Sequence, residues 1–379
     1  MKFESYPFEK LNTLLADISP NQDKKLIALT IGEPQFETPS FIQDALKNSS
    51  SLLKKYPKTA GEKETQAAMI NFNKKRFNVN LKEDELIPCF GTREVLFNFP
   101  QFLLFDVKNP VMAFTNPFYQ IYEGSAIASR AKMVLLNLTK GNEFKPSMSE
   151  EQMQEADFVI LNFPNNPTAS VLSLEELGEW VLLALKYDFV LMNDECYSEI
   201  YIDTPPPSLL EAAKHVGNES LQNTLVINSI SKRSSAPGLR SGFIAGDAQI
   251  LKSYMQYRTY VGCASPLPLQ AAAAVAWEDE KHVRASRIIY KKNFEIAHEI
   301  LGTPIPQASF YIWFSVDDEI AFTKKLFKEH HVKVLPGSFL ARDDEKGENP
   351  GKGYIRIALV HDAVTTRQAM EAIHTCLNS

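Results

Sequence analysis

Short apolar runs alternate with amphipathic stretches through the middle of this chain. Strand-like runs lie near residues 84–89, 111–114, 132–136, 157–161, 188–192, 224–228 and 241–245. Helical patterns separate most of them, and the stretch from Leu174 to Lys186 repeats leucine and valine on one helical face. Such alternation predicts an α/β fold with a seven-stranded, mainly parallel sheet covered by helices on both faces.

The last two runs of this set are joined differently from the others. Only the segment from Ser229 to Arg240 separates them, and it contains Pro237-Gly238. This segment is about as short as a right-handed helical crossover to a parallel strand can be. We therefore expect the final strand to be antiparallel to its neighbours.

The pattern changes after Asp247. One long helix is predicted from Trp277 to Leu301, ending at Gly302. Strand-like runs at 310–314, 332–335 and 354–359 then mix with helices, which indicates an α+β unit. We expect a large domain over residues 46–285 and a smaller α+β domain formed by residues 1–45 and 286–379.

Composition narrows the class of protein. The 379 residues are 44% hydrophobic and 23% charged, typical of a globular protein, and a net charge of −6 disfavours nucleic acid or an anionic membrane as partner. No apolar run is long enough to span a bilayer, and no His/Cys cluster predicts a metal site. The four cysteines are widely spaced, which favours reduced thiols and a cytoplasmic location.

The strongest chemical signal is Ser229-Ile230-Ser231-Lys232, which follows the run at 224–228 and precedes Arg240. Taken alone, the lysine could be a solvated loop charge. A lysine at a strand end, with a hydroxyl and a guanidinium nearby, favours a carbonyl cofactor with a phosphate tail. The lysine can form a Schiff base while serine and arginine bind the phosphate.

Other polar groups follow the ends of other strands. Each also has a structural interpretation: Thr92 as a helix N-cap, Tyr119 as core, Asn166 as part of a turn, Asp194 as a helix cap and Arg356 as an edge-strand charge facing water. Asp194 comes directly after an apolar run, where an unpaired carboxylate would be costly. Strand ends of an open α/β sheet are the usual place for chemistry. Thr92, Tyr119, Asn166 and Asp194 lie at such ends, whereas Arg356 lies inside the strand-like run at 354–359.

The Ser-x-Ser-Lys segment, followed by Gly-x-Arg-x-Gly at 238–242, resembles the pyridoxal-phosphate lysine motif of the class I/II (fold type I) aminotransferases. The resemblance covers essentially the whole chain. It implies pyridoxal 5'-phosphate as cofactor, Lys232 as the residue that holds it and moves the proton, and Asp194 as partner of its ring nitrogen. Tyr197 and Asn166 would bind the ring oxygen.

The same resemblance implies the remaining site residues. Gly91, Thr92 and Arg93 would form the turn that holds the phosphate with Ser229 and Arg240, and Tyr119 would stack on the ring. Gly32, Asn166 and Arg356 would bind the substrate carboxylate. Tyr56 of the partner subunit would reach the phosphate, which implies a homodimer with shared active sites. The chain departs from the family at Glu64-Thr65 and at Ala169, where the family has glycine.

Substrate is indicated by two further segments. These segments are most similar to those of the N-succinyldiaminopimelate aminotransferases of lysine biosynthesis: Tyr6-Pro7-Phe8-Glu9-Lys10-Leu11 and Gly32-Glu33-Pro34-Gln35-Phe36. This resemblance implies N-succinyl-LL-2,6-diaminopimelate as amino donor and 2-oxoglutarate as the oxo-acid acceptor. The alternatives are an aspartate or broad-specificity aminotransferase, a C–S lyase that uses the same cofactor, and a non-catalytic regulator. Lys58, Arg93, Arg233 and Arg258 are candidates for binding a distal carboxylate.

Overall fold

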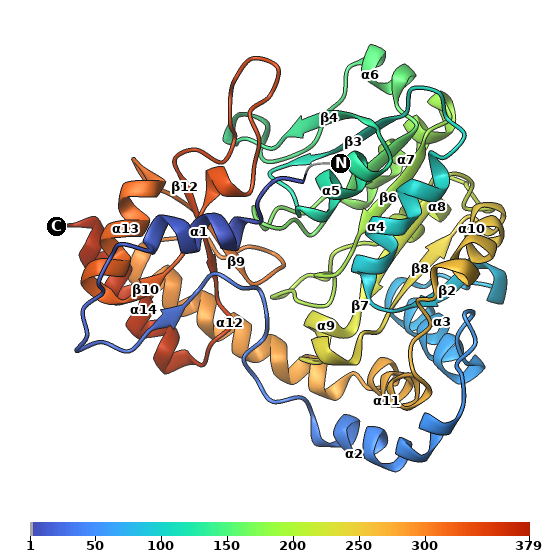
Figure 1. Cartoon of the computed structure of the whole chain (residues 1–379), viewed down its shortest axis with the longest axis horizontal. Helices are drawn as coiled ribbons and strands as arrows, with labels where there is room; N and C mark the ends of the chain where they lie inside the picture. Colours follow the sequence, from blue (N-terminus) through green and yellow to red (C-terminus); the bar gives the residue numbers. More distant parts are fainter. Residues whose placement is uncertain (1–2) are drawn as a thin grey trace.

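A seven-stranded sheet forms the centre of the molecule (Figure 1) in a computed structural model that describes residues 3–379. Strand β8 is antiparallel to both of its neighbours, and the other strands run parallel to one another. The order across the sheet is β2 (Leu86–Cys89), β8 (Gly242–Gly246), β7 (Thr224–Ser229), β6 (Val190–Asp194), β5 (Phe158–Leu161), β3 (Val111–Asn116) and β4 (Lys132–Asn137). The predicted fold class, strand positions and antiparallel last strand are confirmed.

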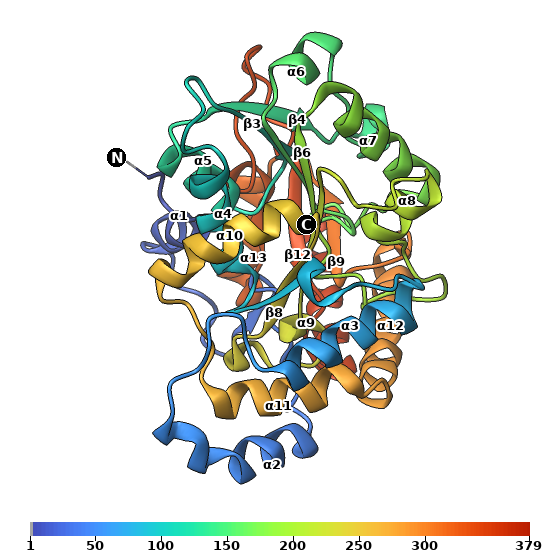
Figure 2. The same cartoon turned by 90° about the vertical axis from the view of Figure 1, so that its right-hand side faces the viewer.

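Both faces of this sheet are buried. Along β7, Leu225 and Ile227 pack on one side while Val226 packs on the other, as the two-residue period of a strand requires. One face is covered by α4 (Thr92–Leu103), α5 (Ile121–Ala128) and α10 (Ala248–Val261). The other is covered by α2 (Ser40–Asn48), α3 (Lys63–Phe77), α7 (Leu174–Tyr187), α8 (Leu209–His215) and α11 (Leu267–Glu278). Figure 2 shows α11 beside α2 and α3.

A smaller unit contains α1 and the C-terminal part of the chain (Figure 1). Its antiparallel sheet has the order β11 (Leu335–Pro336), β12 (Tyr354–Ala358), β9 (Tyr311–Ser315), and a separate pair joins β1 (Ile27–Ala28) to β10 (Val332–Lys333). Helices α12 (Lys281–Leu301), α13 (Glu319–His330), α14 (Ala363–Leu377) and α1 (Pro7–Leu15) surround these strands, while α6 (Glu150–Glu155) and α9 (Ile230–Arg233) belong to the larger part. The domain boundaries remain a prediction, and residue 285 lies within α12.

The prediction that one long helix begins at Trp277 is wrong. Helix α11 ends at Glu278 and α12 begins at Lys281, so Trp277 belongs to the earlier helix. Asp279 has an extended backbone, and its carboxylate accepts a hydrogen bond from the backbone N–H of His282 at 3.0 Å. The carboxylate thus satisfies a free donor in the first turn of α12, which makes a new helix start at this point.

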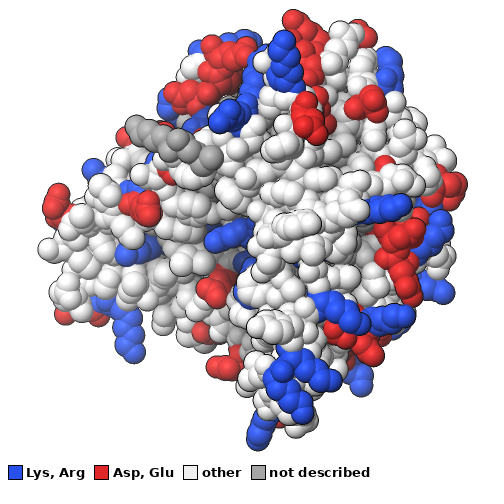
Figure 3. All heavy atoms as spheres, turned by 45° about the vertical axis from the view of Figure 1, so that its right-hand side comes forward, with Lys and Arg blue, Asp and Glu red and all other residues white. Residues whose placement is uncertain are grey.

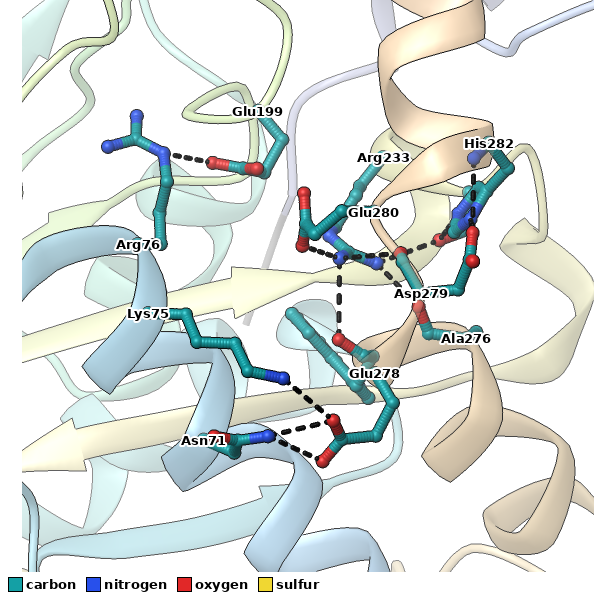
Figure 4. Close-up of polar contacts among 12 residues, drawn as sticks. Asn71, Lys75, Arg76, Glu199, Arg233, Ala276, Glu278, Asp279, Glu280 and His282 are labelled. Atoms are coloured by element: carbon teal, nitrogen blue, oxygen red, sulfur yellow. Dashed lines mark hydrogen bonds and ion pairs between the residues drawn. The ribbon is translucent and has the colours of Figure 1, made fainter.

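Arg233, the residue after Lys232, fastens α9 to this junction (Figure 4). Its guanidinium is buried and donates to the carbonyls of Ala276 (2.6 Å), Trp277 (3.3 Å) and Asp279 (3.1 Å), and it pairs with the Glu280 carboxylate. A cation at the carbonyl end of a helix is favourable because of the helix dipole. Arg233 is therefore committed to α11 and is not available to a substrate.

The next residue, Ser234, contacts His282 at the same junction. The Ser234 hydroxyl lies 2.9 Å from Nε2 of His282, whose Nδ1 lies 2.6 Å from the Asp279 carboxylate. Burial lowers the pKa of His282, although the bond to Asp279 opposes that shift. Two consecutive side chains after Lys232 thus anchor the lysine turn to the start of α12.

The surface and the helices bear on the possible partners. Lys/Arg and Asp/Glu side chains are interspersed on the face in Figure 3. Within residues 3–379, none of the helices is both long and apolar enough to cross a membrane. The same span brings together no group of three His, Cys, Asp or Glu side chains that could hold a metal ion.

A buried ion pair joins α4 to α10. Arg258 is fully buried, and its Nε lies 2.8 Å from Oε1 of Glu94, while Nη2 lies 3.1 Å from Oε2. The Glu94 carboxylate also accepts the backbone N–H of Phe90 at 2.8 Å, just before the turn into α4. Arg258, one of the candidates for binding a distal carboxylate, is therefore paired with Glu94 inside the protein and is not available to a substrate.

We expect the Glu94→Ala substitution to lower the free energy of unfolding by about 3–5 kcal/mol, because it leaves the Arg258 guanidinium buried without a counter-charge. Urea unfolding followed by circular dichroism measures this. Glu278→Ala is the control, since it breaks the exposed pair with Lys75 (Figure 4) and should cost less than about 1 kcal/mol. Equal losses in the two variants would contradict the role given to the buried pair.

Candidate active site

A cleft opens where the carboxyl ends of the parallel strands face the smaller unit. Among the described residues, its walls include every predicted site residue except Gly91 and Tyr56. The predicted residues in its walls are Gly32, Thr92, Arg93, Tyr119, Asn166, Asp194, Tyr197, Ser229, Lys232, Arg240 and Arg356. Segments far apart in the sequence therefore meet at one site, as expected for strand ends at one edge of a sheet.

Lys232 lies on the single turn of α9, directly after β7. Its Nζ donates to the carbonyl of Gly32, so the amine points into the cleft and toward the N-terminal segment. The turn begins at Ser229, whose hydroxyl accepts the backbone N–H of Ser231 at 3.1 Å. This is a primary amine on a short rigid turn, and such a group can form a Schiff base or transfer a proton.

The start of α4 and the side chain of Arg240 form an anion site. Gly91 is the cap with φ +75°, and Thr92 is the first helical residue, so the alternative of Thr92 as N-cap is wrong. A Cβ at Gly91 would lie 2.1 Å from Nη2 of Arg240. Only glycine lets this backbone approach the guanidinium. A helix N-terminus, the Thr92 and Ser229 hydroxyls and an arginine suit a phosphate group.

Asp194 ends β6 and is almost fully buried. Its carboxylate accepts from the Tyr122 hydroxyl at 3.0 Å and from the backbone N–H of Cys196 at 3.2 Å. Burial raises the pKa of this carboxyl, while these hydrogen bonds oppose the rise. A buried carboxylate with only neutral hydrogen-bond partners suits a cationic ring nitrogen. Tyr122 was not predicted; its position in an apolar helix carried no signal beyond core packing.

Arg356 occupies the central strand of the smaller sheet, so the edge-strand alternative is wrong. Its guanidinium is buried and donates to Oδ1 of Asn166 at 2.8 Å and to the carbonyl of Thr30. In the turn that carries Asn166, Ala169 stands where the family has glycine and adopts φ +60°. A fork-shaped cation in a cleft can bind a carboxylate with two hydrogen bonds.

Tyr197 and Tyr311 meet in the floor of the cleft. Their hydroxyl oxygens lie 3.1 Å apart, and burial raises the pKa of Tyr197, which keeps its phenol protonated. The guanidinium carbon of Arg356 lies 4.4 Å from the centre of the Tyr311 ring. Tyr311 was missed by the sequence reasoning, because it lies in a strand-like run whose aromatics suggest only core.

Of the candidate cations for a distal carboxylate, Arg93 alone lines this cleft. Its Nε donates to the Tyr119 hydroxyl at 2.8 Å, and its guanidinium lies 5.8 Å from the Tyr119 ring centre. Lys58 lines a separate small cavity beneath Pro88 and Gln270. Arg233 and Arg258 are committed to buried ion pairs.

Two predicted features lie at the margins of the site. Tyr6, Pro7 and Phe8 line the cleft, so the N-terminal segment that suggested the substrate forms part of its wall. Tyr56 lies outside the cleft and its side chain is fully exposed in the single chain. Its assignment to a partner's site remains a prediction.

The model of the family described as aminotransferase class I and II matches residues 24–373. Among curated relatives, an LL-diaminopimelate aminotransferase of Maridesulfovibrio salexigens is 29% identical over 97% of this chain and 95% of its own length. An LL-diaminopimelate aminotransferase of Natranaerobius thermophilus is 31% identical over 92% of this chain and 91% of its own.

Two solved structures are similar over almost their whole length. The aminotransferase AspB from Helicobacter pylori is 52% identical, with a TM-score of 0.97 and coverage of 100% of both chains. An aminotransferase from Neisseria meningitidis is 43% identical, with a TM-score of 0.94 and coverage of 99% of this chain and 98% of the other. The chain therefore belongs to aminotransferase class I and II, a family of enzymes that use pyridoxal 5'-phosphate.

Proposed function

We propose that this aminotransferase uses N-succinyl-LL-2,6-diaminopimelate as amino donor and 2-oxoglutarate as acceptor, a step of lysine and diaminopimelate biosynthesis. The observation that carries the proposal is the cleft itself. It brings Lys232, Asp194 and Arg356 together and is walled by Tyr6 and Phe8 of the N-terminal segment typical of that subgroup. The relatives named LL-diaminopimelate aminotransferases support a diaminopimelate skeleton.

The site residues suit the cofactor part by part. The phosphate would be held by the backbone at Gly91, Thr92 and Arg93, where α4 begins, by the Thr92 and Ser229 hydroxyls, and by the Arg240 guanidinium. Tyr119 would stack on the ring. Asp194 would pair with the ring nitrogen, while Tyr197 and Asn166 would donate to the ring oxygen.

Each of these residues would have its own role in transamination. When bound, pyridoxal 5'-phosphate supplies a carbonyl carbon for the amino group and a ring that delocalises the electron pair left at Cα. Arg356 binds the α-carboxylate of the donor through its fork, with the Gly32 backbone on the other side. The amine of Lys232 would remove the Cα proton as general base and, as general acid, deliver it to the former carbonyl carbon of the cofactor. The Asp194 carboxylate would keep a proton on the ring nitrogen.

The same groups serve the acceptor half of the reaction. A 2-oxo acid carries the same carboxylate, so Arg356 binds it in the same orientation, and Lys232 moves the proton in the opposite direction. An aspartate or broad-specificity aminotransferase remains the alternative, since AspB of Helicobacter pylori is similar over the whole chain. A C–S lyase would use the same residues and would release an oxo acid without an acceptor.

The proposal also covers the association of two copies of this chain. Tyr56 is fully exposed in the single chain and flanks the short helical turn at Ser50–Lys54, so it is free to enter another subunit. We propose a homodimer in which Tyr56 of the partner subunit reaches the cofactor phosphate. The four cysteines are free, which suits a reducing compartment such as the cytoplasm.

The visible absorption band of the holoenzyme tests the substrate. We expect N-succinyl-LL-2,6-diaminopimelate to abolish the band and 2-oxoglutarate to restore it, because the amino group moves to the cofactor and back. LL-diaminopimelate and aspartate are the competing donors. A band that responds only to one of these would keep transamination and reject the proposed donor. The Lys232→Ala variant is the control and should lack the wild-type band.

Arg356→Lys tests carboxylate binding. Lysine keeps the charge but not the fork, so we expect kcat/KM to fall about 10–150-fold for both donor and acceptor, as for loss of a hydrogen bond to a charged group. Steady-state kinetics measure both constants. Arg367→Lys, in the exposed pair with Glu299 on α14, is the matched control and should leave them unchanged. An effect limited to one substrate would contradict a shared carboxylate site.

Arg93→Ala tests the distal group of the donor. We expect KM for N-succinyl-LL-2,6-diaminopimelate to rise about 10–150-fold, because a charged hydrogen bond to its distal carboxylate is lost. KM for alanine, which has no distal carboxylate, should change little, and Lys58→Ala outside the cleft should change neither constant. Equal rises for both donors would assign Arg93 to the cofactor rather than to the substrate.

A further inference from the structure

Tyr311 is the first residue of β9 and its side chain is almost fully buried. It contacts three residues that belong to the proposed site: Arg356, Tyr197 and Gly32. These three come from β12, from the segment after β6 and from the N-terminal segment. A single aromatic side chain thus lies where the three parts of the site meet.

The ring of Tyr311 supports the carboxylate-binding arginine. Strands β9 and β12 are paired so that Arg356 lies opposite Trp313, and Tyr311 is two residues away on the same face of the sheet. The Arg356 guanidinium carbon lies 4.4 Å from the ring centre, within cation–π range. Because Nε of Arg356 has no hydrogen-bond partner within residues 3–379, the ring contact helps set the plane of the fork.

The hydroxyl of Tyr311 faces the other two partners. It lies 3.1 Å from the Tyr197 hydroxyl, and either hydroxyl can donate to the other. When Tyr311 is the donor, the Tyr197 proton is free to point toward the cofactor. A Cβ at Gly32 would lie 1.7 Å from the same oxygen. The Tyr311 hydroxyl therefore occupies the space that a side chain at position 32 would need, and the Gly32 carbonyl in turn receives Lys232.

From these contacts we infer that Tyr311 is a positioning residue with two separable parts. Its ring orients Arg356 toward the substrate carboxylate, and its hydroxyl orients the Tyr197 phenol toward the cofactor ring oxygen. Substrate recognition and cofactor alignment are thereby joined through one side chain. The inference rests on the roles proposed above for Arg356 and Tyr197.

Two variants of the holoenzyme separate the two parts. Tyr311→Phe keeps the ring and removes the hydroxyl, so the pH midpoint of the visible band should shift and kcat should fall about 2–10-fold, as for one neutral hydrogen bond. Tyr311→Leu also removes the ring. The dissociation constant for propionate should therefore be about 2–30-fold higher in this variant than in Tyr311→Phe, as for a lost cation–π contact. Propionate carries a carboxylate but no amino group, and calorimetry measures its binding without turnover.

Tyr290→Phe is the matched control. Tyr290 is equally buried and packs on Phe310 in the same aromatic cluster, but its hydroxyl has no hydrogen-bond partner in the described part of the chain. Removing that hydroxyl should leave the band, kcat and propionate binding unchanged.

Three results would overturn the inference, and each has a different meaning. Loss of stability in urea with an unchanged band and unchanged propionate binding would make Tyr311 purely structural. A shift in Tyr311→Phe matched by Tyr290→Phe would remove the specific role of the hydroxyl. A wild-type protein without a visible band would reject the proposed function itself, together with this inference.

Discussion

The buried guanidinium of Arg356 is the charge on which the cleft depends. A cation removed from water is stable only when donors and acceptors around it are matched. Here the acceptors come from Asn166, on the larger unit, and from the Thr30 carbonyl, on the N-terminal segment, while the Tyr311 ring lies against the guanidinium. The hydrogen bonds to this one cation therefore hold the large sheet, the small sheet and the N-terminal segment in fixed positions relative to one another.

A second constraint acts on Lys232. Lys232 lies on a helix of one turn, which has too few backbone hydrogen bonds to be stable alone. Arg233 and Ser234 anchor that turn to the junction of α11 and α12. The position of the amine thus depends on a buried network that itself lies outside the cleft.

Much of the fold and part of the site followed from local patterns. The strands of the large sheet were predicted because buried parallel strands are apolar runs bounded by turn residues, and the groups at their ends then shared a site. Contacts between distant segments left no such pattern. The burial of Arg233 and Arg258, the helix break at Asp279, and the contacts of Tyr122 and Tyr311 depend on partners that are close only in the folded chain.

The pairing of the N-terminal segment has a consequence for how the protein is made. The Thr30 carbonyl and Arg356 are 326 positions apart, and Leu29 accepts the backbone N–H of Ala358 at 2.9 Å. Domains begin to fold during synthesis from the N-terminal end. The segment with β1, Leu29 and Thr30 therefore leaves the ribosome long before its partners have been synthesised. The large sheet can form while this segment is still unpaired. Chains truncated before Arg356 therefore lack the arginine to which we assign carboxylate binding.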